Sequence, residues 1–406
     1  MKILLVGEFS NAHNNLAQGL RALGHEVTVA SNGNHWLGYA RDINLVRIIE
    51  PGKGILFKVR NLCHLFSFLL RLLIALPSMK DYDVVQLIHP DFFDLKSERL
   101  FWFYRYLRRH NKILVLGVYG TDYYYVDGMI NKRLLKYSPY SGGDEAEQRI
   151  NIRLREKEWF GSAKEVLQKE IASSCDAIVA CCYEYWLPYR ETTDRDGKGR
   201  LLKEKLYFVP LAICSNSNLL GKPNQQDAGA NLDPKHAQPL RVFIGINKIR
   251  ASFKGASLMM RVADDLAKKY PHCVVVNKVE NVPFATYKKI MEDSDVVIDQ
   301  IYSYSPGMNA LLAMSEGKIV VSGGEQEFYE LLGEDKCRPI INTAPTYDSL
   351  YKSLEDIVLH PELIGELKRK SREYVIRNHD YMNVAKQMVE IYEKCLAQQS
   401  SSLLEC

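Results

Sequence analysis

The 406-residue chain lacks several features that would narrow its function at once. Its charges nearly cancel, and a formal net charge of +4 is too small an excess to indicate nucleic-acid binding. None of its nine cysteines belongs to a Cys-x-x-Cys pair, so no zinc-ligand spacing is present and reduced thiols in a cytoplasm are expected. Met1–Val6 leads directly into an apolar strand, so we expect no signal peptide.

The chain also lacks an uninterrupted apolar run of the roughly 20 residues that a membrane-spanning helix needs. Its most apolar segment, Leu62–Leu76, has about fifteen residues, is interrupted by Arg71, and is flanked by Lys58, Arg60 and Lys80. Two interpretations remain open for it. It is either a buried or half-buried helix of the first domain, or an interfacial helix that dips into the surface of a membrane.

What the chain does contain is an alternation of apolar strands and amphipathic helices. The length suggests two domains rather than one core. The alternation runs from Lys2–Val6 to a strand over Lys205–Val209, and it restarts at Leu240–Gly245. Between them lies a polar stretch rich in Asn, Gln, Gly and Pro. The sequence therefore predicts an α/β protein with an N-terminal domain over residues 1–213, a linker over 214–239 and a second domain over 240–380.

The most informative stretch is Asp295–Gly324. It reads as a buried strand over Asp295–Asp299, a polar loop, a helix over Met308–Glu316 and a second strand over Lys318–Ser322. This order forms one parallel βαβ unit with its loop at the carboxyl end of a strand. Loops at that edge bind ligands in α/β sheets, and the free N–H groups that open a helix favour an anion such as a phosphate.

The segment AMSEGKIVV at residues 313–321 resembles the donor-site text of nucleotide-sugar-dependent glycosyltransferases with the GT-B fold, in which two Rossmann-like domains face each other across a cleft. The likeness is to the large retaining family of bacterial polysaccharide and glycoconjugate enzymes, the glycosyl transferases of group 1. The chain departs from that family at its two glutamates, where Tyr304 and Leu312 stand. It is closer to a divergent branch whose strand ends in Asp-Gln, as Asp299-Gln300 does here.

A second match follows the first strand of the predicted second domain. There the family has Gly-Arg and then Lys-Gly at the start of a helix, and Lys254-Gly255 matches the latter pair. The resemblance implies that Lys254 holds the donor diphosphate, with Lys248 or Arg250 in place of the arginine. Cations suit this role because the departing diphosphate gathers negative charge in the transition state. The alternative for each of them is a solvated surface cation.

The loop before the predicted helix over Met308–Glu316 supplies the other donor-site candidates. Its backbone N–H groups could bind the diphosphate, its serine hydroxyls could donate hydrogen bonds, and Tyr304 could stack on the sugar. The alternative is an ordinary N-capped helix with Pro306 near its start. Glu316 could replace the missing ribose contact or be a surface residue. The predicted donor set is Lys248, Arg250, Lys254, Gly255, Ser303, Tyr304, Ser305, Gly307, Met308 and Asn309, with Glu325 and Glu327 as further candidates.

The resemblance assigns the first domain to the acceptor. Tyr119-Gly120-Thr121-Asp122 resembles the family's His-Gly-x-Asp segment, so Asp122 could position the acceptor hydroxyl or act as a general base, unless it caps the next segment. A tyrosine-rich stretch, residues 123–150, has no clear period and is predicted to be an acceptor-binding loop. The predicted acceptor set is Asn11, His13, His89, Tyr119, Asp122 and Tyr123, with helix capping as the alternative for Asn11 and His13.

The resemblance implies a glycosyltransferase that moves a sugar from a nucleotide-diphosphate sugar to a saccharide or lipid-linked acceptor, with retention of the anomeric configuration. It also implies that a C-terminal helix over 381–406 crosses back to the first domain. Asp122 and Lys254 are its candidate catalytic residues. No cofactor or metal is required, because cations and helix-end amides stabilise the leaving group and the nucleotide sugar is a co-substrate. The alternatives are a sugar-nucleotide epimerase on the same fold and a non-catalytic binding or scaffold protein.

Overall fold

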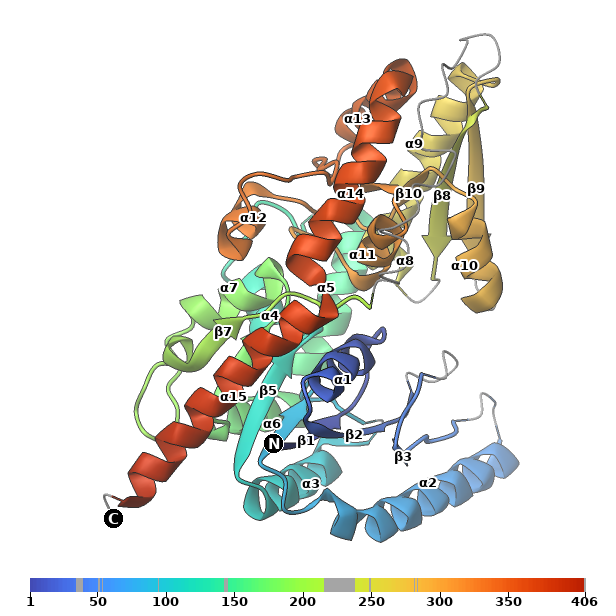
Figure 1. Ribbon diagram of the computed structural model, residues 1–406. Coiled ribbons are helices and arrows are strands. Elements are labelled where there is room, and N and C mark those ends of the chain that lie inside the picture. The colour runs from blue at the N-terminus through green and yellow to red at the C-terminus, as the bar shows by residue number, and fades with distance from the viewer. Residues whose placement is uncertain are drawn as a thin grey trace.

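The computed structural model describes residues 1–33, 39–49, 52, 54–93, 95–141, 145–214, 238–247, 250–280, 282 and 284–404. These ranges form two α/β domains, each built on its own parallel sheet (Figure 1). The predicted α/β fold with two Rossmann-like domains is therefore confirmed. Most of the predicted linker, and Lys248 of the predicted donor set, lie outside the described residues.

The first domain holds a seven-stranded sheet in the order β3-β2-β1-β4-β5-β6-β7, and every neighbouring pair is parallel. The direction of winding reverses between β1 and β4, which is the kind of switch point where such sheets bind ligands. The strands are β1 (Lys2–Val6), β2 (Glu26–Ser31), β3 (Ile43–Asn44), β4 (Val84–Leu87), β5 (Ile113–Val118), β6 (Ala177–Ala180) and β7 (Leu206–Phe208). The helices are α1 (Ala12–Ala22), α2 (Ile55–Ala75), α3 (Ser97–His110), α4 (Tyr123–Ile130), α5 (Glu145–Trp159), α6 (Ala163–Ser174) and α7 (Tyr183–Glu191), with 3-10 turns at Leu76–Met79 and Leu202–Lys205.

The second domain holds a four-stranded parallel sheet in the order β11-β10-β8-β9, which reverses between β8 and β10. Its strands are β8 (Leu240–Ile246), β9 (Val274–Glu280), β10 (Val296–Ile298) and β11 (Ile319–Val321). Its helices are α8 (Ala251–Lys254), α9 (Ala256–Lys269), α10 (Phe284–Glu292), α11 (Met308–Ser315), α12 (Gln326–Leu332), α13 (Tyr347–Leu359) and α14 (Ile364–His379), with a 3-10 turn at Pro361–Leu363. The βαβ unit predicted over Asp295–Gly324 is confirmed as β10, α11 and β11.

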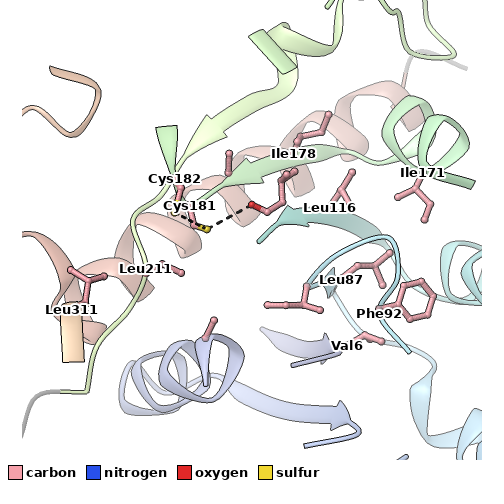
Figure 2. Packing of buried hydrophobic residues seen from close by; sticks show 14 of the residues in the cluster. Val6, Leu87, Phe92, Leu116, Ile171, Ile178, Cys181, Cys182, Leu211 and Leu311 are labelled. Atoms are coloured by element: carbon pink, nitrogen blue, oxygen red, sulfur yellow. Dashed lines mark hydrogen bonds between the residues drawn. The ribbon is translucent and has the colours of Figure 1, made fainter. Parts of the chain in front are cut away.

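The core of the first domain follows from the register of its central strands. Val6, Leu87, Leu116 and Ile178 are successive partners across β1, β4, β5 and β6, so their side chains point to the same face of the sheet. Figure 2 shows them in one hydrophobic cluster with Cys181 and Cys182, the adjacent thiols that follow β6. Burial of each such aliphatic side chain stabilises the fold by roughly 1.5–3 kcal/mol. The eight cysteines within the described ranges are all free thiols.

The last helix, α15 (Tyr381–Leu404), returns to the first domain and lies against α1 (Figure 1). The close approach requires a glycine, because a Cβ on Gly19 would come within 2.4 Å of the Tyr381 carbonyl oxygen. Farther along, the Tyr392 hydroxyl donates to Gln86 on β4 at 2.5 Å. A helix that follows the second domain in sequence is thus part of the packing of the first.

Helix α2 is half-buried, with one face against the first domain and the other exposed. Within α2 only Phe68 and Leu72 are buried, so the helix is not fully buried, whereas a half-buried helix and an interfacial helix both agree with its exposure. Arg71 donates to the Val46 carbonyl at 2.6 Å, which directs the interrupting charge toward the protein. Together with the following turn, Ile55–Met79 is long and apolar enough to cross a membrane by length and composition alone, and 22% of its most apolar window is buried. Figure 1 shows α2 along the edge of the first domain, away from the second.

The predicted tyrosine-rich loop over residues 123–150 is helical at both ends, so the prediction of an irregular loop is wrong there, whereas residues 131–141 between the helices are irregular. It contains α4 and the first residues of α5. The Tyr124 hydroxyl donates to Asp194 at 2.9 Å, and Tyr140 packs edge-on against Phe253 of the second domain. The sequence shows no helical spacing of apolar and polar residues there, because the tyrosines are buried together with their polar hydroxyls.

Candidate functional site

A cavity of about 250 Å³ lies where the carboxyl ends of strands from both sheets meet. The loops after β1, β4, β5 and β6 form its first-domain wall, and the loops after β8 and β10 form the second. This is the edge at which open α/β sheets bind ligands. The lining residues that matter below are Phe9, His89, Tyr119, Tyr125, Arg155 and Glu184 from the first domain, and Arg250, Phe253, Lys254, Gln300 and Ser303 from the second.

Lys254 lines the cavity, and Gly255 follows it directly in the turn between α8 and α9. Gly255 has a left-handed backbone with φ of 77°, and a Cβ there would lie 2.6 Å from Ile301, so the turn needs glycine. Lys254 Nζ is 2.6 Å from Asp299 Oδ1, and Asn309 Nδ2 donates to the same oxygen at 3.2 Å. Asp299 therefore fixes the position of the lysine at the cavity wall.

Two arginines join Lys254 around the cavity. Arg250 comes just before the short helix α8 and is exposed. Arg155 reaches over from α5 of the first domain, where its guanidinium lies 4.8 Å from the centroid of the Phe253 ring and pairs with Glu158. A cation over an aromatic face is held electrostatically by the ring. Three cations from two domains thus surround one space, an arrangement suited to an anionic ligand.

On the opposite wall, His89 is a neutral histidine with a fixed tautomer. Its Nδ1 accepts from the Asp91 backbone N–H at 3.1 Å, so the proton lies on Nε2, which donates to the Thr121 carbonyl at 3.1 Å. Burial lowers the pKa of His89 to about 4, because the charged form loses its hydration. The predicted residues His89 and Tyr119 both line the cavity, where each contributes an uncharged ring.

The predicted donor loop makes a different contact, which we call the seam. The seam joins Lys136, Tyr137 and Tyr183 of the first domain to Tyr304, Ser305, Glu325 and Glu327 of the second. The Tyr304 ring stacks on Tyr183 with centroids 5.7 Å apart, and its hydroxyl accepts from the Lys136 backbone N–H at 2.9 Å. Ser305 Oγ accepts from the Tyr183 N–H at 2.8 Å. In this structure both donor-loop side chains are buried in the domain contact rather than turned to a ligand.

The two glutamates proposed for the donor also belong to the seam. Glu325 accepts from the Tyr137 hydroxyl, and Glu327 pairs with Lys136 at 3.3 Å. Gly307, Met308 and Asn309 are partly exposed at the start of α11 and do not line the cavity, although Asn309 supports it through Asp299. Of the donor residues predicted in this loop, Ser303 lines the cavity, and its neighbours Gln300 and Tyr302 line it too.

Asp122 has the capping role rather than the catalytic one. Its Oδ1 accepts from the Tyr125 backbone N–H at 2.8 Å at the start of α4, and its Oδ2 accepts from Tyr189 at 2.7 Å and from Gln168 at 3.2 Å. The carboxyl group is fully buried, which raises its pKa to about 6. Because both oxygens already have partners inside the domain, the prediction of a general base is not supported by this geometry.

Three further acceptor candidates also lie away from the cavity. His13 is buried, with Nδ1 2.8 Å from the Gly7 carbonyl oxygen and Nε2 3.2 Å from Gln86, and burial lowers its pKa to about 3. Asn11 donates to Asn15 at 2.9 Å rather than capping α1. Tyr123 lies beneath the Lys169 ammonium, 4.4 Å from the ring centroid. These residues stabilise the first domain.

The sequence reasoning missed Arg155 and Glu184. Arg155 lies on α5, and its position at the cavity depends on a contact with the other domain that no motif within one domain records. Glu184 had a usable signal, because it follows β6 just as His89 follows β4. The rule that selected His89, a polar side chain just beyond a buried parallel strand, also selects Glu184.

No protein-family model and no curated protein sequence matches the chain. Solved structures do match its fold over nearly its whole length. Anabaena HepE in complex with UDP and glucose is 12% identical with a TM-score of 0.54, covering 97% of this chain and 100% of that one. WaaG, a glycosyltransferase involved in lipopolysaccharide biosynthesis, is 10% identical with a TM-score of 0.52, covering 97% and 99%.

The UDP-GlcNAc 2-epimerase from Neisseria meningitidis, bound to UDP-GlcNAc, is 13% identical with a TM-score of 0.50, covering 97% of this chain and 100% of that one. At such identities the likeness shows the fold alone, since one fold carries several activities. The chain therefore has the predicted GT-B fold, which it shares with glycosyltransferases and with an epimerase that acts on a nucleotide sugar.

Proposed function

We propose that the chain is a glycosyltransferase that moves a sugar from a nucleotide-diphosphate sugar to a saccharide or lipid-linked acceptor in the interdomain cavity. The observation that carries the proposal is the convergence of Lys254, Arg250 and Arg155 on one cavity between two GT-B domains. HepE, which shares the fold, holds UDP and glucose. The family resemblance makes the synthesis of bacterial surface polysaccharides or glycoconjugates its proposed setting.

In the proposed reaction the cations bind the donor diphosphate and stabilise the charge that gathers on it as the sugar bond breaks. Fixed donors of this kind are effective because they need no reorganisation during the reaction. Asp299 orients Lys254 at the cavity wall before the donor arrives. With this charge stabilisation we expect no metal requirement, and the resemblance leads us to propose retention of the anomeric configuration.

The opposite wall suits a saccharide acceptor. Phe9, Tyr119 and Tyr125 offer rings and hydroxyls, and the neutral His89 adds no charge. Aromatic faces pack against the C–H faces of sugars while hydroxyls hydrogen-bond their rims. The acceptor hydroxyl that attacks the donor would enter from this wall.

Helix α2 favours an acceptor at a membrane surface. Ile55, Val59, Leu62, Phe66, Leu70 and Leu73 recur every three or four residues on one face, and each is more than half exposed. Exposed cations, Lys58 and Arg60, border the stripe. This combination is typical of helices that lie in the headgroup region of anionic bilayers. We propose a cytoplasmic enzyme held peripherally at the inner face of the membrane.

Nucleotide binding tests the transferase proposal. We expect one of UDP, GDP, ADP or CMP to raise the unfolding temperature of the protein, since a ligand at about 100 times its dissociation constant adds roughly 2.7 kcal/mol of stability. Lys254→Ala should remove that shift, whereas Lys136→Ala, a cation of the seam outside the cavity, should retain it. A parent protein that no nucleotide stabilises would favour the scaffold alternative.

Vesicle sedimentation tests the membrane proposal. The parent should sediment with vesicles that contain phosphatidylserine or phosphatidylglycerol, and the double variant Phe66→Ser/Leu70→Ser should remain in the supernatant because both side chains are on the exposed stripe. Equal sedimentation of the two proteins would remove α2 from the proposal and leave the cavity chemistry unaffected.

The epimerase is the second candidate function, because the UDP-GlcNAc 2-epimerase matches the fold with nearly the same coverage. The product separates the two. A transferase releases the nucleoside diphosphate only as the acceptor gains a sugar, whereas an epimerase converts UDP-GlcNAc in the absence of any acceptor. Chromatography of the sugar nucleotide after incubation without acceptor decides between them.

A further inference from the structure

Glu184 lies in the first turn of α7, just beyond β6, and its side chain lines the cavity. It is 6% exposed, so its carboxylate has little contact with bulk water. It faces the second domain there, because its Oε1 accepts from the hydroxyl of Ser303 in the loop that follows β10. This is a direct contact between the two walls of the cavity.

The other carboxylate oxygen, Glu184 Oε2, has no hydrogen-bond partner within the described part of the chain, although it is fully buried. A buried polar atom without a partner is unfavourable, more so when it is charged, and in native proteins such an atom usually has a water or ligand as its partner. Two of the cavity cations are already paired elsewhere, Lys254 with Asp299 and Arg155 with Glu158. Burial raises the pKa of Glu184, in keeping with a carboxyl group that lacks a cation.

The charge of Glu184 decides which part of a donor it can contact. A carboxylate repels the diphosphate, which the cations attract, but it accepts hydrogen bonds from hydroxyl groups. The cavity thus has a cationic side at Arg250 and Lys254, and an acceptor oxygen at Glu184. A sugar joined to a diphosphate carries these two chemistries next to each other.

We propose that Glu184 Oε2 accepts a hydrogen bond from a hydroxyl of the donor sugar, so that the first domain supplies a carboxylate to the donor site. The proposal rests on the proposed function. Ser303 holds the carboxylate in position through Oε1.

The test compares a nucleoside diphosphate with its sugar conjugate in the full-length protein. Affinities for UDP and UDP-glucose, and for GDP and GDP-mannose, are measured by titration calorimetry. Glu184→Gln keeps the shape of the side chain and the acceptor oxygen for Ser303, but puts an NH2 group, which donates and cannot accept, in the place of Oε2. It should bind the nucleotide sugar about tenfold or more weakly and bind the nucleoside diphosphate as the parent does.

Glu325→Gln is the matched control, because Glu325 accepts from Tyr137 and Asn342 at the seam and does not line the cavity. It should change neither affinity. If Glu184→Gln does not fold, Glu184→Asp replaces it, since the shorter side chain retracts the oxygen and should lose the same preference for the sugar conjugate.

The outcomes separate this inference from the function on which it rests. If the Glu184 variant loses affinity equally for both ligands, the residue only holds the two domains together. That result, or no loss of affinity at all, would overturn the inference but not the proposed function. A parent that binds the nucleoside diphosphate but gains nothing from the sugar would also overturn it. A parent that binds no nucleotide would overturn the proposed function and the inference together.

Discussion

The seam and the cavity lie between the same two domains, but they use their polar groups differently. At the seam the partners cross the boundary: Lys136 pairs with Glu327 and the Tyr183 N–H donates to Ser305. Around the cavity the ion pairs stay within one domain, with Lys254 on Asp299 and Arg155 on Glu158. The seam therefore joins the domains through an ion pair and hydrogen bonds. The two walls of the cavity touch through the Ser303–Glu184 hydrogen bond and the Arg155–Phe253 contact, but their ion pairs stay within each domain.

The largest expected effect is at the seam, on Tyr304. Tyr304→Ala removes a ring that stacks on Tyr183 and contacts Tyr137, and loss of a buried aromatic side chain costs about 3–5 kcal/mol. Urea unfolding should show this loss. Tyr304→Phe is the control, because it keeps the ring and removes only the hydrogen bond from the Lys136 N–H, a cost of about 1 kcal/mol.

A loss below 1 kcal/mol for Tyr304→Ala would mean that the seam does not hold the domains in solution. The distinction between a filled seam and an open cavity would then disappear.

The next effect concerns pH at the cavity wall, through His89. Its pKa is about 4 when folded and near 6.5 when unfolded, so between these values the unfolded state binds the additional proton. The stability contributed by His89 is therefore complete above pH 6.5 and falls by about 3 kcal/mol as the pH falls to 4. We expect the difference in unfolding free energy between the parent and His89→Gln to shrink by that amount over this range.

The parent must be compared with the variant, because buried carboxyl groups change the unfolding free energy with pH in the opposite direction to His89. Burial raises the pKa of Glu8 to about 7, so this group stabilises the folded state at low pH and loses that contribution as the pH rises to 7. A gap between the parent and His89→Gln that stays constant from pH 6.5 to 4 would contradict the assignment of a neutral, buried His89.

The seam and the cavity also show what the sequence can and cannot predict. Lys254 and Gly255 were predicted from a match to the resembled family, and that match reflects local structure. Gly255 is required by its positive φ, and Lys254, the last residue of α8, is held by Asp299. Tyr304 and Ser305 were assigned to the right loop, but their partners come from the other domain. No periodicity within one domain specifies that contact.

The same limit explains why the sequence left two interpretations open for α2 and two for Asp122. The exposed stripe of α2 has the composition of a core helix, so only the three-dimensional structure shows that nothing within the described ranges covers it. Asp122 sits at the end of a parallel strand, where both a cap and a catalytic base are found, and its three side-chain and backbone donors decide for the cap. The fold itself follows from the alternation of strands and helices.

A smaller effect is expected from Gly255, which shapes the turn beside Lys254. Gly333, after α12, has nearly the same backbone, φ 73° against 77°, but a Cβ there meets nothing within 4 Å. Gly333→Ala should cost about 1 kcal/mol for the left-handed backbone. Gly255→Ala should cost roughly 2–3 kcal/mol, because its Cβ also meets the buried Ile301 at 2.6 Å. Equal losses in urea unfolding would mean that the turn at the cavity relaxes freely.

The smallest effect should come from Lys136, although it forms an ion pair across the seam. Its side chain is 70% exposed, so water and salt screen its attraction to Glu327. Lys136→Ala should leave the urea midpoint within experimental error, because Tyr304 bonds the backbone N–H of this residue, which the substitution retains. A clear loss at low salt that vanishes at about 1 M salt would instead show that charge helps to close the seam.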